Sequence, residues 1–292
     1  MKAEAILPIH SSTMKDRPLK SSLPYLMLVV TALLWSTGGF LVKGIQWHPV
    51  AIAGMRSLIA ATVILIIIRK PELTWSLPQL GGAICYAGTV TFYVIANKLT
   101  TSANVVLLMY TAPIYVIIFG PWFLKEKASG KDWLAVGIIM VGISIFFIER
   151  LSPEGFWGNV LAVLSGLSFA WMTLFLRKQK RGSPVESVFL GNLLAAVIGL
   201  PFFLKEELPE INGILMLVAL GTFQLGISYV LYAKAIQKVR AFQAVLITML
   251  EPILNPLWVF LLLGEVPGKW ALAGGAIVMV TVVFHGLTTG RK

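Results

Sequence analysis

Two charged side chains, Arg56 and Glu251, lie well inside long apolar stretches of this 292-residue chain. At membrane depth an ionisable group costs at least about 2.5 kcal/mol and is a functional candidate by default. A guanidinium binds carboxylates, and a carboxylate binds an amino group or a proton, so the pair suits the two ends of a zwitterion. For Arg56 we favour the alternatives, a structural salt bridge or a side chain that reaches back to the headgroups. For Glu251 we favour a functional role, because the helix-breaking Pro252 follows it.

Neutral polar and aromatic side chains within the same stretches supply the rest of a candidate binding site. A pocket needs apolar surface with a few placed polar groups, and tyrosine and tryptophan provide both. For any single residue, helix packing or an interhelical hydrogen bond is the simpler explanation, but so many polar atoms at depth are hard to satisfy without a wet cavity. The candidate substrate-binding residues are Trp35, Ser36, Tyr86, Tyr93, Tyr110, Trp171, Gln224, Tyr232, Gln243 and Asn255.

The composition places these side chains in a membrane protein. Apolar residues make up 57% of the chain and charged residues 13%, about half the charged share of a soluble domain. The net charge of +11 would by itself suggest a nucleic-acid partner, but a soluble fold of this length has no interior for so much apolar surface. We therefore expect the lipid bilayer, and no nucleic acid, as a partner. One cysteine and three widely separated histidines predict no metal site and no cofactor.

Ten apolar runs predict ten transmembrane helices in an all-α integral membrane protein. Each run is near the ~20 residues that a crossing requires, and backbone groups in lipid must bond within their own segment. No A-x-A cleavage site follows the first run, so we expect a retained helix there and not a signal peptide. The predicted spans cover residues 24–42, 50–68, 80–95, 103–124, 133–148, 156–176, 185–204, 213–233, 242–263 and 270–287.

The positive charges predict how these spans are oriented. If the N-terminal side is the inner one, inward-facing segments carry 18 Lys and Arg residues, outward-facing loops carry 5, and Arg56 completes the 24. Short loops rich in Lys and Arg remain in the cytoplasm. We expect a multi-pass protein of the inner or plasma membrane with both termini cytoplasmic.

The chain contains a weak internal repeat. Residues 93–126 match residues 232–265 at a constant offset of 139, which pairs Tyr93 with Tyr232 and Glu126 with Glu265. Five spans per repeat is an odd number, so the second repeat starts on the opposite side of the membrane, as in many transporters. The alternative is a duplication that merely built a scaffold. The two glutamates are symmetry mates; one interpretation is that they clasp neighbouring helices and act as gates, and the interpretation we favour is that they are ordinary boundary residues.

The repeat predicts two inverted five-helix units around a central cavity. We expect the first unit over residues 23–150 and the second over residues 151–288, with cytoplasmic tails at 1–22 and 289–292. Pro113 and Pro252 are symmetry mates, and each removes a helical hydrogen bond. Matched helix breaks that line the cavity are the favoured interpretation, and packing kinks are the alternative.

Several motifs carry a family resemblance over about residues 24–287. They are Leu34-Trp35-Ser36, residues 55–61 (Met-Arg-Ser-Leu-Ile-Ala-Ala), residues 110–113 (Tyr-Thr-Ala-Pro), Lys125-Glu126, and Glu251-Pro252 through Gly264-Glu265. With these motifs the chain resembles the ten-helix EamA-type branch of the drug/metabolite transporter superfamily. The resemblance implies a cavity lined largely by spans 1, 3, 4, 6, 8 and 9. It also implies export of amino acids, other metabolites or drugs, or import of metabolites, usually across a bacterial inner membrane.

The functional hypothesis is a secondary transporter that exports a small organic metabolite by alternating access. Neutral or aromatic amino acids are the first substrates to consider, and the superfamily alternatives are a flippase for lipid-linked substrates and a drug exporter. Proton coupling through Glu251, uniport and exchange all stay open. The chain has no H-E-x-x-H, no paired embedded aspartates and no nucleophile motif, so we expect no enzyme. Ten helices can enclose a cavity within one chain, so a monomer is sufficient.

Overall fold

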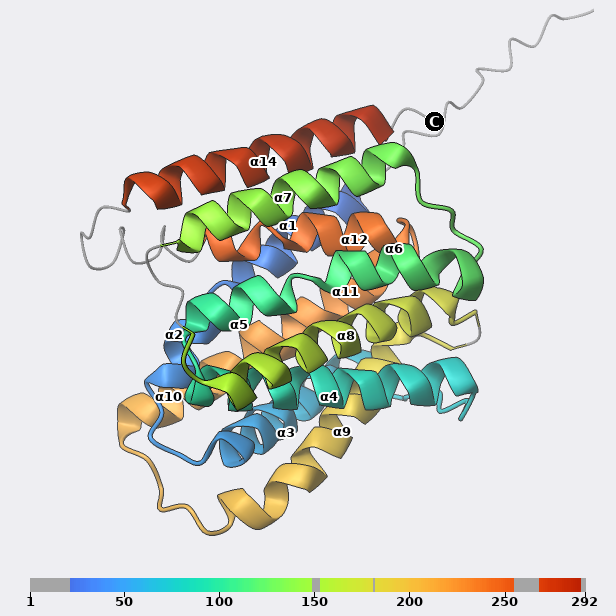
Figure 1. The fold of residues 1–292 in the computed structure, drawn as a ribbon. Helices are drawn as coiled ribbons and strands as arrows, with labels where there is room; N and C mark the ends of the chain where they lie inside the picture. The colour runs from blue at the N-terminus through green and yellow to red at the C-terminus, as the bar shows by residue number, and fades with distance from the viewer. Residues whose placement is uncertain (1–21, 149–152, 181, 255–267, 290–292) are drawn as a thin grey trace, which may run out of the picture.

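The computed structural model describes residues 22–148, 153–180, 182–254 and 268–289, and every regular element within them is a helix. In these residues nine helices are long and apolar enough to cross a membrane. A tenth apolar helix, Ala241–Leu254, is shorter, and the rest of the predicted ninth span lies outside the described residues. The predicted all-α membrane architecture is confirmed (Figure 1).

The helices follow the order of the predicted spans in both halves. The first half contains α1 (Leu23–Trp35), α2 (Gly38–Lys43), α3 (Pro49–Ile68), α4 (Leu77–Leu99), α5 (Ser102–Met109), α6 (Ala112–Phe123) and α7 (Gly130–Phe147). The second half contains α8 (Phe156–Lys178), α9 (Pro184–Phe203), α10 (Ile211–Ala219), the π-helix η1 (Leu220–Ile227), α11 (Ser228–Ile236), α12 (Ala241–Thr248) and α14 (Lys269–Thr289).

Local capping chemistry determines where two of the crossing helices begin. Ser129 and Asp132 form a reciprocal capping box at the start of α7, and Ser183 and Glu186 form another at the start of α9. Each box satisfies two backbone N–H groups that would otherwise lack partners at a helix N-terminus. These starts follow from short polar signals that precede the apolar runs.

Helix packing is symmetric under exchange of the two halves. The second spans of the halves, α3 and α9, pack against each other, and so do the fifth spans, α7 and α14, which lie side by side in Figure 1. Glycines allow the close approach in both pairs. A Cβ on Gly54 would lie 2.6 Å from the Cα of Gly199, and a Cβ on Gly142 would lie 3.2 Å from the carbonyl oxygen of Gly274. Contacts between other spans show the same symmetry. The third span packs on the sixth through α4 and α8, and the equivalent eighth span packs on the first through α11 and α1.

The predicted helix breaks occur in the fourth and ninth spans, just ahead of the prolines. The fourth span breaks at Tyr110 and Thr111, between α5 and α6. Pro113 then stands in the first turn of α6, where a missing N–H costs little. Helix α12 is the same length as α5 and sits at the same offset of 139, and Pro252 again follows the break. The equivalent pieces therefore agree in length and in position, as expected from an internal duplication.

Two irregularities have no proline and were not predicted. The first span is interrupted at Ser36 and Thr37, between α1 and α2. The eighth span, predicted as one regular helix, contains the π-helix η1. Short π-helical turns inside α-helices are frequent at functional sites. Both irregularities lie in helices that face the centre of the bundle.

Candidate functional site

A narrow cavity lies between the two halves. The described residues that line it are Trp35, Arg56, Thr89, Val90, Tyr93, Met109, Gln224, Leu225, Tyr229 and Glu251. None of these side chains is more than 7% exposed, so little of the lining is open to solvent. They belong to spans 1, 2, 3, 4, 8 and 9. The expected contribution from span 6 is therefore absent from this lining, and Arg56 brings in span 2 instead.

The guanidinium of Arg56 faces this cavity with only neutral partners. The side chain is 1% exposed, so it does not reach back to the headgroups. One Nη atom donates to the Oε1 atom of Gln224 at 3.2 Å and the other to the backbone oxygen of Val90 at 2.9 Å. The Nε atom has no hydrogen-bond partner. Among the described residues no ion pair reaches Arg56, so the structural salt bridge considered as an alternative is not formed.

The carboxylate of Glu251 meets Tyr110 at the point where the two broken helices come together. The Tyr110 hydroxyl contacts Glu251 Oε2 and also lies 3.1 Å from the carbonyl oxygen of Thr248. Tyr110 belongs to the break in the fourth span, and Glu251 begins the helical turn that follows the equivalent break at Met249 and Leu250 in the ninth. The matched breaks thus bring a phenol hydroxyl from the first half against a carboxyl that lines the cavity.

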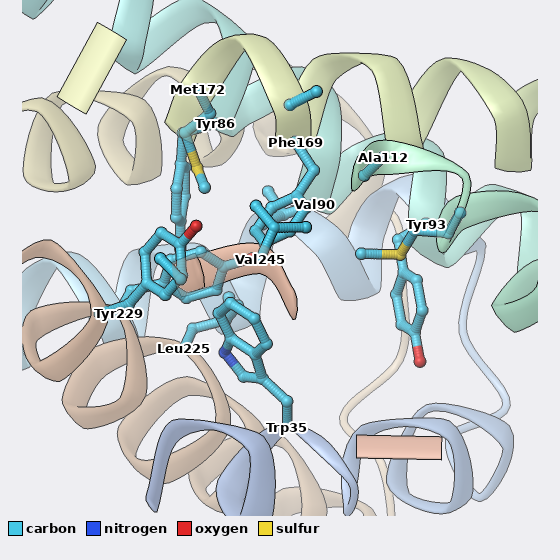
Figure 2. Packing of buried hydrophobic residues seen from close by; sticks show 14 of the residues in the cluster. Trp35, Tyr86, Val90, Tyr93, Ala112, Phe169, Met172, Leu225, Tyr229 and Val245 are labelled. Carbon is cyan, nitrogen blue, oxygen red and sulfur yellow. The ribbon is translucent and has the colours of Figure 1, made fainter. Parts of the chain in front are cut away.

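Aromatic rings form one wall of the cavity. Figure 2 shows the rings of Trp35, Tyr229 and Tyr86 gathered together, while Tyr93 stands apart from them. The ring centroids of Trp35 and Tyr229 are 4.7 Å apart, and those of Tyr86 and Tyr229 are also 4.7 Å apart. The indole Nε1 of Trp35 donates to the hydroxyl of Ser228 at 2.9 Å. The wall therefore offers apolar ring surface whose polar atoms are largely paired within the protein.

Three candidate residues lie behind the wall and not on the cavity surface. The Tyr86 hydroxyl donates to Asn192 Oδ1 at 3.0 Å. The Tyr232 hydroxyl pairs with the Thr173 hydroxyl at 2.7 Å, and its ring lies 5.4 Å from that of Trp35. The Ser36 hydroxyl donates back to its own helix, to the carbonyl of Leu33. These side chains hold the lining residues in place.

Three other candidates are not brought to the cavity by the described structure. Trp171 is half-buried and stacks on Phe119 and Phe123, with centroid distances of 4.9 and 5.4 Å. Gln243 accepts the backbone N–H of Arg240 at the start of α12. Asn255 lies outside the described residues.

Tyr229 is a further aromatic residue at depth of the kind that the sequence marks as candidate lining, whereas four other lining residues were not predicted: Thr89, Val90, Met109 and Leu225. A helical signal for two of them was present, because Thr89 and Val90 follow Tyr86 at spacings of three and four and precede Tyr93 by the same spacings. Residues at these spacings share a helix face. Met109 and Leu225 carry no polar atom that would mark them in an apolar run.

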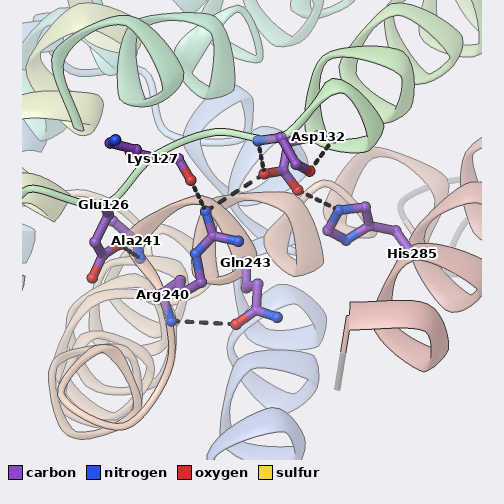
Figure 3. A network of polar contacts seen from close by, with 8 residues as sticks. Glu126, Lys127, Asp132, Arg240, Ala241, Gln243 and His285 are labelled. Carbon is purple, nitrogen blue, oxygen red and sulfur yellow. Dashed lines mark hydrogen bonds and ion pairs between the residues drawn. The ribbon is translucent and has the colours of Figure 1, made fainter. Parts of the chain in front are cut away.

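A second polar cluster joins the two halves at one end of the bundle, the end formed by the loops after α3, α6, α8 and α11. We call it the basic end. Arg177 pairs with Glu126 at 2.9 Å. Buried Asp132 contacts His285 at 2.7 Å and Arg240 at 3.5 Å (Figure 3). Each of these pairs, the only ion pairs between described residues, links the first half to the second.

Glu126 therefore does more than mark a helix boundary. Its Oε1 atom accepts from Arg177 Nε, and its Oε2 atom accepts the backbone N–H of Ala241 at 3.0 Å. The side chain clasps the end of α8 and the start of α12, which corrects our interpretation of it as an ordinary boundary residue. Its mate Glu265 lies outside the described residues.

The fold and the polar cavity are those of a membrane carrier, and comparison with known proteins agrees. Residues 22–148 and 156–287 match the EamA-like transporter family. The chain belongs to this family. It is thus a multi-pass membrane transporter. Across the described part of the chain no group of three or more His, Cys, Asp or Glu side chains is arranged to hold a metal ion.

Individual relatives are distant but cover most of the chain. An uncharacterized transporter of Archaeoglobus fulgidus is 25% identical over 88% of this chain and 93% of its own length. A probable amino-acid metabolite efflux pump of Salmonella typhimurium is 21% identical over 87% of this chain and 91% of its own. Solute carrier family 35 member G1 of Mus musculus is 24% identical over 87% of this chain and 75% of its own. A solved crystal structure, 20% identical, superimposes with a TM-score of 0.78 over 92% of this chain and 98% of its own, which shows the same fold.

Proposed function

We propose that this chain is a secondary transporter that exports a neutral or aromatic amino acid by alternating access across the inner (plasma) membrane. The observation that carries the proposal is the buried guanidinium of Arg56, which faces the cavity and has no acidic partner among the described residues. Both termini lie in the cytoplasm in this proposal, because the basic end carries the excess of Lys and Arg. The name of the Salmonella relative, a probable amino-acid metabolite efflux pump, points to the same substrate class.

A carboxylate is the ligand that best satisfies Arg56. Neutral acceptors compensate a buried charge only in part, and an uncompensated buried charge is costly. Arginine presents N–H donors in a planar fork that matches a carboxylate, and the Nε donor of Arg56 is unused. Glu251 lines the same cavity and supplies the opposite charge for an amino group. The two ends of an α-amino acid therefore have a partner each.

The aromatic wall supports a neutral side chain on the substrate. Trp35, Tyr93 and Tyr229 line the cavity, and no further charged side chain among the described residues does. Aromatic faces favour apolar or aromatic groups packed against them. A substrate with a charged side chain would have to bury that charge without a partner.

Proton coupling through Glu251 is part of the proposal. The Tyr110 hydroxyl lies between the Glu251 carboxyl and the Thr248 carbonyl and has one proton to donate. When Glu251 is charged, Tyr110 donates to it. When Glu251 is protonated, it donates to Tyr110, which then donates to Thr248. The hydrogen bond between Glu251 and Tyr110 is therefore kept in both protonation states, and its direction reverses.

Transport by purified protein in proteoliposomes tests the substrate class. We expect labelled L-phenylalanine to exchange with unlabelled neutral amino acids, and Arg56→Gln to reduce the rate at least about tenfold, the scale of a lost hydrogen-bonded charge contact. The matched control is Arg69→Gln, at the exposed end of the same helix, which should transport normally. A contrary result would be that amino acids neither exchange nor stabilise the protein. Stabilisation by polyprenyl-linked sugars would then favour the flippase, and stabilisation by drugs would favour the drug exporter.

An imposed pH gradient tests the coupling separately. We expect the gradient to accelerate uptake by the wild-type protein and to have no effect on Glu251→Gln, which keeps the shape of the side chain but holds no exchangeable proton. Equal acceleration of both proteins would show that Glu251 is not the coupling site and would leave the substrate class untouched.

A further inference from the structure

Gln224 occupies one N–H donor of the Arg56 guanidinium. The Oε1 atom of Gln224 accepts from an Nη atom of Arg56 at 3.2 Å, and both side chains line the cavity. Gln224 is 6% exposed. Only two of the five N–H donors of the guanidinium are used, one by Gln224 and one by the Val90 carbonyl. Gln224 is thus the one side chain among the described residues that holds the guanidinium.

The backbone around Gln224 places its side chain next to Arg56. The residue lies within η1, which packs against α3. A Cβ on Gly221 would lie 2.8 Å from the carbonyl oxygen of Arg56, so η1 approaches α3 as closely as backbone contact allows. One turn later, the Ser228 hydroxyl donates to the Gln224 carbonyl and accepts from Trp35. The π-helical turn therefore ties the amide at Arg56 to the aromatic wall.

We propose that Gln224 is a surrogate ligand, a side chain whose oxygen takes the place of the substrate carboxylate on Arg56 while the cavity is empty. This inference rests on the proposed function. The amide oxygen is a neutral and weaker acceptor than a carboxylate, so an arriving carboxylate displaces it. Binding then exchanges one hydrogen bond of Arg56 for a stronger one, and the side chain of Gln224 sets how tightly the carboxylate is held.

A surrogate ligand and a purely structural residue differ in how the affinity for carboxylates changes when the amide of Gln224 is removed. Gln224→Met replaces the amide by an apolar group of similar size. The substrate carboxylate then no longer competes with the amide oxygen for Arg56, and we expect its affinity to rise several-fold. Gln224→Glu places a fixed carboxylate beside Arg56, and we expect affinity to fall at least about tenfold. If Gln224 instead positions Arg56 or contacts the substrate, Gln224→Met weakens binding.

Equilibrium binding to the purified full-length protein in detergent provides the test, with L-phenylalanine, 3-phenylpropionate and phenethylamine as probes. Gln224→Met should raise affinity for the first two, which carry a carboxylate, and leave phenethylamine unchanged. The matched control is Gln243→Met, a buried glutamine away from the cavity, which should change none of the three. The unfolding temperature of Gln224→Glu should be no lower than that of the wild type, because its new carboxylate is paired with Arg56.

The failures of the two proposals are distinguishable. Weaker carboxylate binding by Gln224→Met, or unchanged binding by Gln224→Glu, overturns the inference and leaves the amino-acid transporter standing. Absence of binding of all three probes to the wild type contradicts the proposed function, and the inference falls with it.

Discussion

Two charges buried in the same cavity are stabilised in different ways. Glu251 is matched by the Tyr110 hydroxyl on the opposite half, whereas Arg56 has neutral acceptors and an unused Nε donor. A buried group with unsatisfied donors raises the free energy of the empty state, and a ligand that satisfies them recovers it on binding. At the scale of single residues, therefore, Arg56 is the charged side chain among the described lining residues that has a donor without a hydrogen-bond partner.

Removal of the Tyr110 hydroxyl should destabilise the protein. In Tyr110→Phe the Glu251 carboxyl loses its partner in a buried site, and we expect the free energy of unfolding to fall by about 1–3 kcal/mol. Tyr115→Phe is the control on the same span, because its half-buried hydroxyl has only a 3.5 Å contact with Thr111, and its effect should stay within about 0.5 kcal/mol. Denaturant unfolding in detergent measures both. Equal losses in the two variants would show that the Glu251 contact is not stabilising.

Residue types at depth were predictable from the sequence, but their partners were not. Arg56 and Glu251 stand out because charges are rare in apolar runs. Whether they pair depends on how helices from the two halves rotate and tilt, which loop lengths and hydropathy do not specify. Trp171 shows the same limit, because it lies in an apolar run like Trp35 but packs on Phe119 and Phe123.

At the scale of elements, the prolines predicted the helix breaks, whereas the capped starts and the interior irregularities were not predicted. The matched breaks at Pro113 and Pro252 and the starts at Ser129 and Ser183 follow local rules that act within one turn. The π-helix η1 has no such signal. It arises where Gly221 lets the eighth span press against α3, which is a tertiary contact that the local sequence does not encode.

Close packing of α7 and α14 should fail when Gly274 is enlarged. In Gly274→Ala the new methyl group would lie 2.7 Å from the Cα of Phe146, so backbone must move, and we expect a loss of about 1–3 kcal/mol in the free energy of unfolding. Gly286→Ala, on the same helix, meets no atom within 4 Å and should be neutral or slightly stabilising. Thermal unfolding in detergent compares them. A neutral Gly274→Ala would mean that the two helices are not packed at this point.

At the scale of the whole molecule, near-symmetric packing is combined with an asymmetric distribution of charge. Equivalent helices of the two halves make nearly equivalent contacts. The ion pairs that join the halves, among the described residues, nevertheless all lie at the basic end. At the opposite end the described links are hydrogen bonds, such as that from the His48 N–H to Glu206. In the alternating access that we propose, opening at the basic end must separate these partners, so we expect the cluster to hold that end closed.

Weakening the cluster at the basic end should expose the cavity from that end. Glu126→Gln removes the ion pair with Arg177 while one oxygen remains for the N–H of Ala241, and a partly exposed pair of this kind is worth about 0.2–1 kcal/mol. We therefore expect a cysteine at position 109, in a Cys85→Ser background, to react with a polar thiol reagent up to about fivefold faster.

The matched control for Glu126→Gln is Glu206→Gln at the opposite end, where no ion pair between described residues is broken. Its cysteine at position 109 should react at the parental rate. If both variants or neither accelerated the reaction, the ion pairs at the basic end would not hold the cavity shut.

The most direct test of the central claim is the affinity of the protein for ligands that differ only in their charged ends. We expect the wild type to bind L-phenylalanine at least about tenfold more tightly than phenethylamine, which lacks the carboxylate. In Arg56→Gln the two affinities should become nearly equal, because the carboxylate has lost its partner. An Arg56→Gln protein that keeps the full wild-type preference for L-phenylalanine would contradict a carboxylate site at Arg56.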